Sequence, residues 1–263
     1  MPATRHRMLA TAALATAATV LATTPALARP SGPAGPAVLR APLLRPEGGA
    51  AHQGRPHGDR ANGTSANWAG YAATGTTFTS VSASWVQPQV HCTTEDTYSS
   101  FWVGLDGDGS RSVEQNGSSA DCSGGKPQYY AWFEMYPAFP VVYTDHVEPG
   151  DRFTASVTAA AGGKFTLTIS DETQHWSHTQ HKTLSSAKLA SAEVIVEAPS
   201  TLSGPLPLAD FGTVGFTDAR ANGKPIGGFG PENITMADHD HTVLATTSPL
   251  GDDSAFEVTW NHS

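Results

Sequence analysis

Long hydrophobic runs are scarce in this sequence. One extended apolar stretch, residues 9–27, is rich in alanine and threonine, follows Arg5 and Arg7, and ends in an Ala-x-Ala site at Ala28. These features predict a secretory signal peptide over residues 1–28 rather than a membrane anchor. No other stretch is apolar and long enough to cross a bilayer, so we expect a secreted, extracellular protein with no membrane partner.

Cysteine is equally scarce, since the chain contains two, Cys92 and Cys122. In an exported protein an isolated pair is expected to form one disulfide, which closes a loop of about thirty residues. A catalytic thiol would leave the other cysteine unpaired, so thiol chemistry is not expected.

Basic side chains are few and unevenly placed. Residues 1–60 contain seven Lys or Arg and two Asp or Glu, which leaves eight basic and 22 acidic residues in 61–263, a net charge of −14. Such an anionic domain argues against nucleic acid as a partner and is compatible with work at low pH. Residues 29–62, rich in Pro, Gly, Ala and Arg, are expected to form a pro-segment or linker, which leaves one domain at residues 63–263.

Helical periodicity is also missing, because no segment longer than about ten residues keeps a clean 3.6-residue repeat with caps. Short alternating runs separated by turn residues predict an all-β fold, an antiparallel β-sandwich of two packed sheets. Strands are expected at residues 67–72, 80–87, 99–105, 112–115, 128–135, 152–159, 164–170, 191–197, 212–217 and 256–260.

Several of these strands have two different faces. In residues 191–197, alternate positions form a small apolar face and an opposite face with two carboxylates, Glu193 and Glu197. Charged side chains in the middle of a sheet cost free energy unless that face is wet or lined with partners. Trp102 and Glu134 lie on similar faces of two further strands, and aromatic and acidic side chains on one face are typical of a substrate cleft.

Six short motifs occur in order: NWAGY at residues 67–71, WVGLDG at 102–107, QNG at 115–117, WFE at 132–134, AEVIVE at 192–197 and ADFG at 209–212. Together they resemble the eqolisin family of glutamic peptidases over roughly residues 65–260, here as a secreted member of bacterial type. The resemblance implies a concanavalin-like or lectin-like sandwich with catalytic residues on the concave sheet face.

The resemblance also implies roles for individual residues. Gln115 and Glu193 fall on the catalytic dyad, and the substrate-binding positions are Trp68, Trp102, Asp106 and Glu134. The implied activity is acid endopeptidase action on polypeptides by a monomer, without metal or cofactor. Tyr130 and Val194 depart from fungal members, which carry an acidic residue and Trp there, and both departures bear on the hydrogen bonds of the dyad and on substrate preference.

The chemistry of the dyad suits peptide hydrolysis in acid. An ionised Glu193 can take a proton from water and return it to the leaving amine, while the Gln115 amide can donate to the oxyanion. Because glutamine does not titrate, we expect an acidic pH optimum. Work at about pH 2–4 also requires hydrogen-bond donors that keep the pKa of Glu193 low.

Other chemistries have weaker signals. No Gly-x-Ser-x-Gly motif supports a serine triad. The histidine-rich runs at 175–181 and 238–241 are expected to be exposed hairpin tips rather than metal sites. Two alternatives stay open: a glycoside hydrolase that uses Glu134 and Glu193, and a non-catalytic module that binds carbohydrate or protein.

Overall fold

The computed structural model describes residues 62–201 and 204–263, so the expected signal peptide and almost all of the expected pro-segment lie outside the described residues. In the described part the regular elements are β-strands apart from one short 3₁₀ helix, and no helix there has the length and apolarity of a membrane span. The elements are β1 (Asn62–Ser65), β2 (Trp68–Ala73), β3 (Ser80–Val86), β4 (Ser100–Leu105), β5 (Val113–Ser123), β6 (Lys126–Tyr136), β7 (Val141–Val142), β8 (Arg152–Ala160), β9 (Lys164–Asp171), β10 (Trp176–Thr183), β11 (Ala192–Glu197), β12 (Ser200–Thr201), β13 (Gly204–Pro205), β14 (Thr213–Ala221), β15 (Lys224–Pro225), the 3₁₀ helix η1 (Ile226–Phe229), β16 (Glu232–Ala237), β17 (Val243–Thr247) and β18 (Phe256–Trp260).

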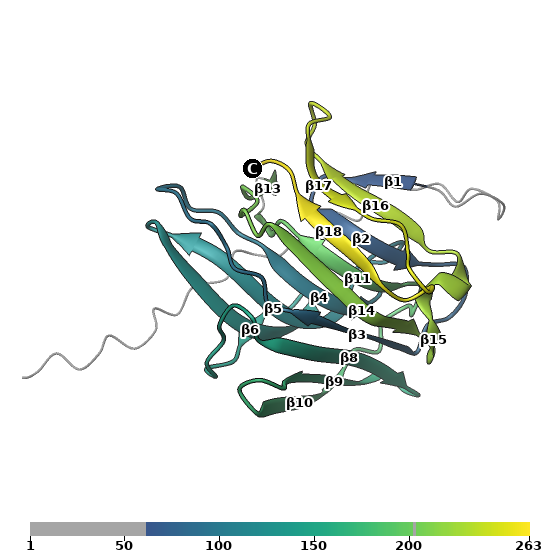
Figure 1. The fold of residues 1–263 in the computed structure, drawn as a ribbon. Helices are drawn as coiled ribbons and strands as arrows, with labels where there is room; N and C mark the ends of the chain where they lie inside the picture. The colour runs from purple at the N-terminus through teal and green to yellow at the C-terminus, as the bar shows by residue number, and fades with distance from the viewer. Residues whose placement is uncertain (1–61, 202–203) are drawn as a thin grey trace, which may run out of the picture. The chain divides into compact units, whose positions relative to one another are not determined.

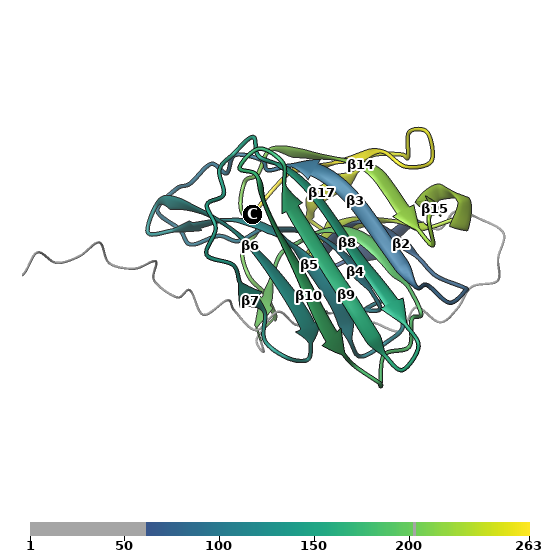
Figure 2. The same ribbon diagram turned by 90° about the horizontal axis from the view of Figure 1, so that it is seen from below.

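Sixteen of these strands form one hydrogen-bonded sheet that folds back on itself. Its main path runs β10-β9-β8-β3-β14-β18-β17-β16-β2-β11-β4-β5-β6-β7. The neighbours on this path are antiparallel, whereas β1 pairs in parallel with β16. β8 packs against β4 and β5, β9 packs against β5, and β3 packs against β4 and β11 (Figures 1 and 2). The expected antiparallel sandwich is confirmed, with its two layers continuous through β16, β17 and β18.

The apolar faces of the two layers meet in one core. Phe101 and Val103 of β4 and Val194 of β11 are fully buried there, opposite Phe153 of β8 and Leu167 of β9. Because alternate residues point to opposite faces of a strand, this packing fixes which residues of β4 and β11 point away from the core. The two-faced strands predicted from the sequence are therefore confirmed.

The polar run at 175–181 was expected to be a hairpin tip, and that prediction is wrong. Most of the run belongs to β10, which pairs with β9 along its whole length. Trp176 and His178 are half-buried, because alternate residues of this edge strand point inward. The run at 238–241 does lie in the turn between β16 and β17. Among the described residues no cluster of three or more His, Cys, Asp or Glu could hold a metal ion.

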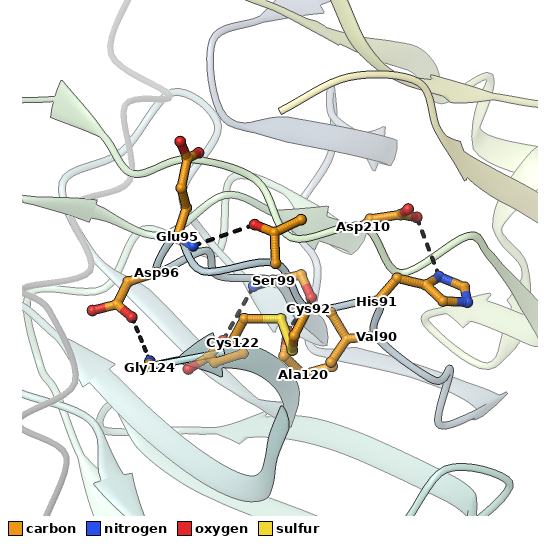
Figure 3. The surroundings of a disulfide bond; sticks show 12 residues. Val90, His91, Cys92, Glu95, Asp96, Ser99, Ala120, Cys122, Gly124 and Asp210 are labelled. Atoms are coloured by element: carbon orange, nitrogen blue, oxygen red, sulfur yellow. Dashed lines mark hydrogen bonds and ion pairs between the residues drawn. A yellow bond between two sulfur atoms is a disulfide. The ribbon is translucent and has the colours of Figure 1, made fainter. Parts of the chain in front are cut away.

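The predicted disulfide is present between Cys92 and Cys122 (Figure 3). It joins the connection between β3 and β4 to the far end of β5, 30 residues further along the chain. The Asp96 carboxylate accepts the Gly124 N–H at 2.8 Å beside it. The disulfide therefore anchors a long connection to one of the central strands of its layer.

Replacing both cysteines by alanine is expected to lower the free energy of unfolding by about 3 kcal/mol, because the disulfide restricts the unfolded chain through a loop of this length. For a domain of about 200 residues this corresponds to a decrease in Tm of about 10 °C. Thermal denaturation of the variant, beside the wild type with and without reductant, measures the effect. An unchanged Tm in the variant would contradict it.

Candidate active site

One row of residues crosses the sheet layer on the face that points away from the core. The register of the strands places Ala72 of β2 beside Glu193 of β11, and Glu193 beside Gly104 of β4. Gly104 lies beside Gln115 of β5, and Gln115 lies beside Glu134 of β6. Five neighbouring strands, of which β2 and β11 are far from β4, β5 and β6 in the sequence, thus bring three of the predicted site residues into one line.

Gly104 separates the two candidate dyad residues without placing a side chain between them. Since neighbouring strands lie about 4.8 Å apart, the backbones at Glu193 and Gln115 are about 10 Å apart. A Cβ atom at Gly104 would come within 2.8 Å of the Trp102 ring and within 3.3 Å of the Gln115 Cβ. Glycine at this position therefore leaves room for the Trp102 ring to pack beside Gln115.

The predicted tryptophans lie on the same face. The rings of Trp68 and Trp102 make an edge-to-face contact with centroids 5.2 Å apart. Trp102 donates its Nε1–H to the Glu197 carboxylate at 2.9 Å, and Trp132 donates to the Ser119 hydroxyl at 2.9 Å. Polar residues of this face therefore fix the orientation of the Trp102 and Trp132 rings beside the row.

Glu193 is completely buried in this structure. Its Oε1 accepts the Asp108 N–H at 3.4 Å, and its Oε2 has no hydrogen-bond partner among the described residues. Desolvation raises the pKa of Glu193 well above its ordinary value, and the charges of Asp108 and Asp106 raise it further. The predicted set of donors that keeps this pKa low is not found, because the donors near Glu193, the Ser191 hydroxyl and the Asp108 N–H, do not compensate for the loss of solvent.

Gln115 and Glu134 are also buried and contact each other. The Gln115 Nε2 donates to the Glu134 Oε2 at 2.5 Å, whereas the Gln115 Oε1 has no partner among the described residues. Burial raises the pKa of Glu134 well above its ordinary value, and repulsion from Glu197 adds to the increase, while the Gln115 hydrogen bond opposes it. Each of the two predicted dyad residues therefore has one oxygen without a partner among the described residues: Oε1 of Gln115 and Oε2 of Glu193.

Asp106 has a different environment from the other predicted site residues. Its carboxylate is fully buried and accepts three backbone N–H groups, those of Lys188 at 2.8 Å, Leu189 at 2.9 Å and Ala190 at 2.8 Å. These residues lead directly into β11, and the Asp106 N–H donates to the Ser191 carbonyl at 3.1 Å. We therefore expect Asp106 to position the strand that carries the glutamates rather than to contact substrate.

Replacing Asp106 by asparagine is expected to lower kcat about tenfold and leave KM within about threefold. The reason is that one carboxylate oxygen, which accepts backbone N–H groups, is replaced by an NH₂ group, which is itself a donor. The free energy of unfolding should fall by about 2 kcal/mol. Steady-state kinetics and thermal denaturation measure both effects. Asp96→Asn, which changes an exposed carboxylate that also accepts a backbone N–H, is the control and should leave kcat unchanged. An increase confined to KM would instead make Asp106 a substrate contact.

The two departures from the family pattern have separate locations. Val194 is fully buried and faces the core between the layers, so it does not contribute to the row. Tyr130 lies on the face of the row and donates its hydroxyl to the Asp121 Oδ2 at 2.7 Å. Burial raises the pKa of Asp121 to about 7, although Tyr130 and the Ser99 N–H both stabilise its charged form.

Sequence reasoning missed Asp121 because the expected strand at 112–115 ended too early. In the structure β5 continues to Ser123. If the expected strand had been extended in the same way, alternation would have placed Gly117, Ser119 and Asp121 on the same face as Gln115. The same continuation places Glu114 on the core face, where it is fully buried and where neither of its oxygens has a hydrogen-bond partner among the described residues.

The spacing of the glutamates does not favour the glycoside hydrolase alternative. Glu193 on β11 and Glu134 on β6 are separated by two intervening strands, so their backbones are about 14 Å apart. The carboxyl pairs of glycosidases lie about 5–9.5 Å apart on either side of one glycosidic bond. Gln115, which is hydrogen-bonded to Glu134, also lies between the two glutamates in the row.

The class of protein follows from comparison of the whole domain with known families. The sequence profile of the Peptidase A4 family matches residues 66–260, so the chain belongs to this family. It is a glutamic-type endopeptidase that acts on polypeptides, and the resemblance drawn from the six motifs is confirmed.

Individual relatives agree with this assignment. Aspergillopepsin-2 from Aspergillus niger is 29% identical over 216 residues, which cover 72% of this chain and 76% of the relative. The structure of scytalido-glutamic peptidase with a transition state analog inhibitor superposes with a TM-score of 0.64 at 23% identity, over 74% of this chain and 98% of that chain. Aspergilloglutamic peptidase from Aspergillus niger has a TM-score of 0.54 at 27% identity, over 63% and 99% of the two chains.

Proposed function

We propose that Glu193 and Gln115 are the catalytic dyad of a secreted acid endopeptidase. One observation carries the assignment: the two side chains flank Gly104 in one row of the sheet, and each presents an oxygen without a partner among the described residues. Buried polar groups are normally hydrogen-bonded, and unpaired ones are typical of sites that bind a ligand or carry out chemistry.

The dyad can supply the three requirements of peptide hydrolysis. Ionised Glu193 takes a proton from a water molecule between the two side chains, and the resulting hydroxide attacks the scissile carbonyl. The Gln115 amide donates an N–H to the oxyanion of the tetrahedral intermediate. Protonated Glu193 then gives its proton to the amine as the C–N bond breaks, which regenerates the carboxylate.

The raised pKa of Glu193 has a consequence for the pH profile. The group acts as a base only when it is ionised, so kcat falls on the acidic side as Glu193 becomes protonated in the enzyme–substrate complex. Admission of substrate and water into the row lowers this pKa from its value in the closed site, because the carboxylate is then solvated. We infer that activity has an optimum at acidic pH, and that its decrease on the acidic side of this optimum reflects the protonation of Glu193.

The neighbouring residues are proposed to hold the substrate. Trp68 and Trp102 provide an apolar surface beside Gly104 for side chains of the peptide, and Glu134 acts through Gln115. SCP-B, an eqolisin of the same fold, has been solved in a complex with the tripeptide Ala-Ile-His. We propose that the chain is monomeric, that residues 1–28 direct secretion, and that residues 29–62 are a pro-segment of the enzyme.

Cleavage of acid-denatured casein by the purified protein at about pH 3–4 tests this function. Pepstatin and a chelator are included to exclude contaminating aspartic peptidases and metallopeptidases. Wild-type cleavage that resists both inhibitors supports the proposal. An inert wild type that binds a polysaccharide without turnover would support the binding-module alternative.

A further inference from the structure

The hydrogen bond between Gln115 and Glu134 determines which end of the Gln115 amide is left without a partner among the described residues. With Nε2 donating to the Glu134 Oε2, the amide oxygen is the end without a partner. A carbonyl oxygen in that position repels an oxyanion, which needs an N–H donor. The orientation that pairs Gln115 with an ionised Glu134 is therefore unfavourable for the role proposed for Gln115.

Protonation of Glu134 reverses this preference. A carboxylic acid has an O–H that can be donated to the Gln115 Oε1, and this bond requires the amide to rotate by about half a turn. The two ends of a carboxamide are nearly equal in size, so the rotation needs no rearrangement of the surrounding packing. After the rotation, both N–H groups of Nε2 are free to point toward Gly104 and Glu193.

We propose that Glu134 is a proton-dependent positioning residue, and that the oxyanion donor of Gln115 is assembled only when Glu134 carries a proton. This inference rests on the proposed function, because it assigns a regulator to the Gln115 of the dyad. The productive form of the enzyme then contains an ionised Glu193 and a protonated Glu134.

The surroundings of Glu134 favour its protonated form. Glu134 is 1% exposed, and the charged group that acts on it from β11 is Glu197, another carboxylate. On β5 its neighbour is the uncharged Gln115, and β7, which pairs with β6 on the other side, consists of two valines. Burial and repulsion act in the same direction and keep the pKa of Glu134 high, so the acid is protonated in the range where an acid peptidase works.

The pH dependence of kcat/KM for Glu134→Gln tests the inference. In this variant the introduced amide can donate an N–H to the Gln115 Oε1 at every pH, so the alkaline limb of the profile should move up by at least about one pH unit. Glu134→Leu offers no donor, and kcat should fall at least about tenfold at all pH values while KM changes little. Glu197→Gln is the matched control, because it removes the repulsion on Glu134 and should move the alkaline limb down instead.

A second measurement is independent of turnover. The side-chain ¹⁵N–H₂ resonances of Gln115, assigned by their loss in Gln115→Ala, should titrate with the alkaline limb in wild type and stay constant in Glu134→Gln. Tryptophan fluorescence at each pH confirms that the protein is folded. If Gln115→Ala is inactive but Glu134→Gln keeps the wild-type alkaline limb and the wild-type titration, this inference is wrong and the proposed function stands. If Gln115→Ala retains full activity, the proposed function itself fails.

Discussion

Replacing Glu193 by glutamine is expected to lower kcat by at least about 10³-fold at every pH, because an amide neither accepts the proton of water nor returns one to the leaving amine. The loss should appear equally in kcat and kcat/KM, since the interaction is made in the transition state. Steady-state cleavage of a peptide substrate between about pH 2 and pH 7 measures it.

The same substitution should not harm the fold, which separates loss of chemistry from loss of structure. Glu193 is fully buried, and desolvation makes its neutral form the stable one. Glutamine has a similar shape and no charge to bury, so the Tm of Glu193→Gln should equal or exceed that of wild type at about pH 7. An inactive variant with a greatly lowered Tm would not support the catalytic role, and an active one would contradict it.

The folded domain is expected to be most stable in acid and to lose stability as the pH rises toward about 8. Burial raises the pKa of Glu114 and that of Glu197 to about 8, and that of Asp121 to about 7. For each group the folded value lies above the ordinary value near 4. The stabilisation is therefore fully present below about pH 4, where both states are protonated. It is lost as the pH rises, because the unfolded chain releases these protons first.

The size of this loss of stability follows from the difference between the pKa of each buried acid in the folded protein and its pKa in the unfolded chain. Each unit of separation corresponds to about 1.4 kcal/mol, so these groups together account for several kcal/mol between about pH 4 and pH 8. For a domain of this size, Tm should decrease by at least about 10 °C over that range. Calorimetry or circular dichroism at a series of pH values measures it. A Tm that rises from pH 4 to pH 8 would contradict the structure.

A pair of variants distinguishes the buried acids from the surface charge. Glu114→Gln removes a buried titrating group from the core face and should flatten the dependence of Tm on pH. Glu257→Gln removes an exposed carboxylate on β18 and should leave the slope nearly unchanged. Equal slopes in the two variants would assign the effect to repulsion across the anionic surface instead.

The sequence predicted the fold where one face of a strand is apolar and the other is polar. β4 and β11 are recognised by their alternation because their inner residues meet the opposite layer. β10 was missed because its half-buried residues, such as His178 and Gln180, are themselves polar. β16 and β17 were missed because they are short and contain few large apolar residues, so nothing in the local sequence indicates their pairing.

The candidate site was predictable to a similar degree. Motif order indicated Gln115 and Glu193, but only the register across β11, β4 and β5 shows that Gly104 lies between them. The role of Asp106 was not predictable, because its partners are backbone N–H groups about 80 residues away in the sequence. The high pKa of Glu193 was also missed, since burial depends on the whole domain rather than on neighbours in the chain.

A double-mutant cycle of Gln115→Ala and Glu193→Gln tests the central claim most directly. If the two residues act on one transition state, each single variant should be nearly as inactive as the double variant, and the losses in log kcat should be far from additive. All proteins are compared at the wild-type optimum, with Tm confirming that each is folded. Additive losses, or a single variant that keeps wild-type kcat, would contradict the claim that Glu193 and Gln115 form a catalytic unit.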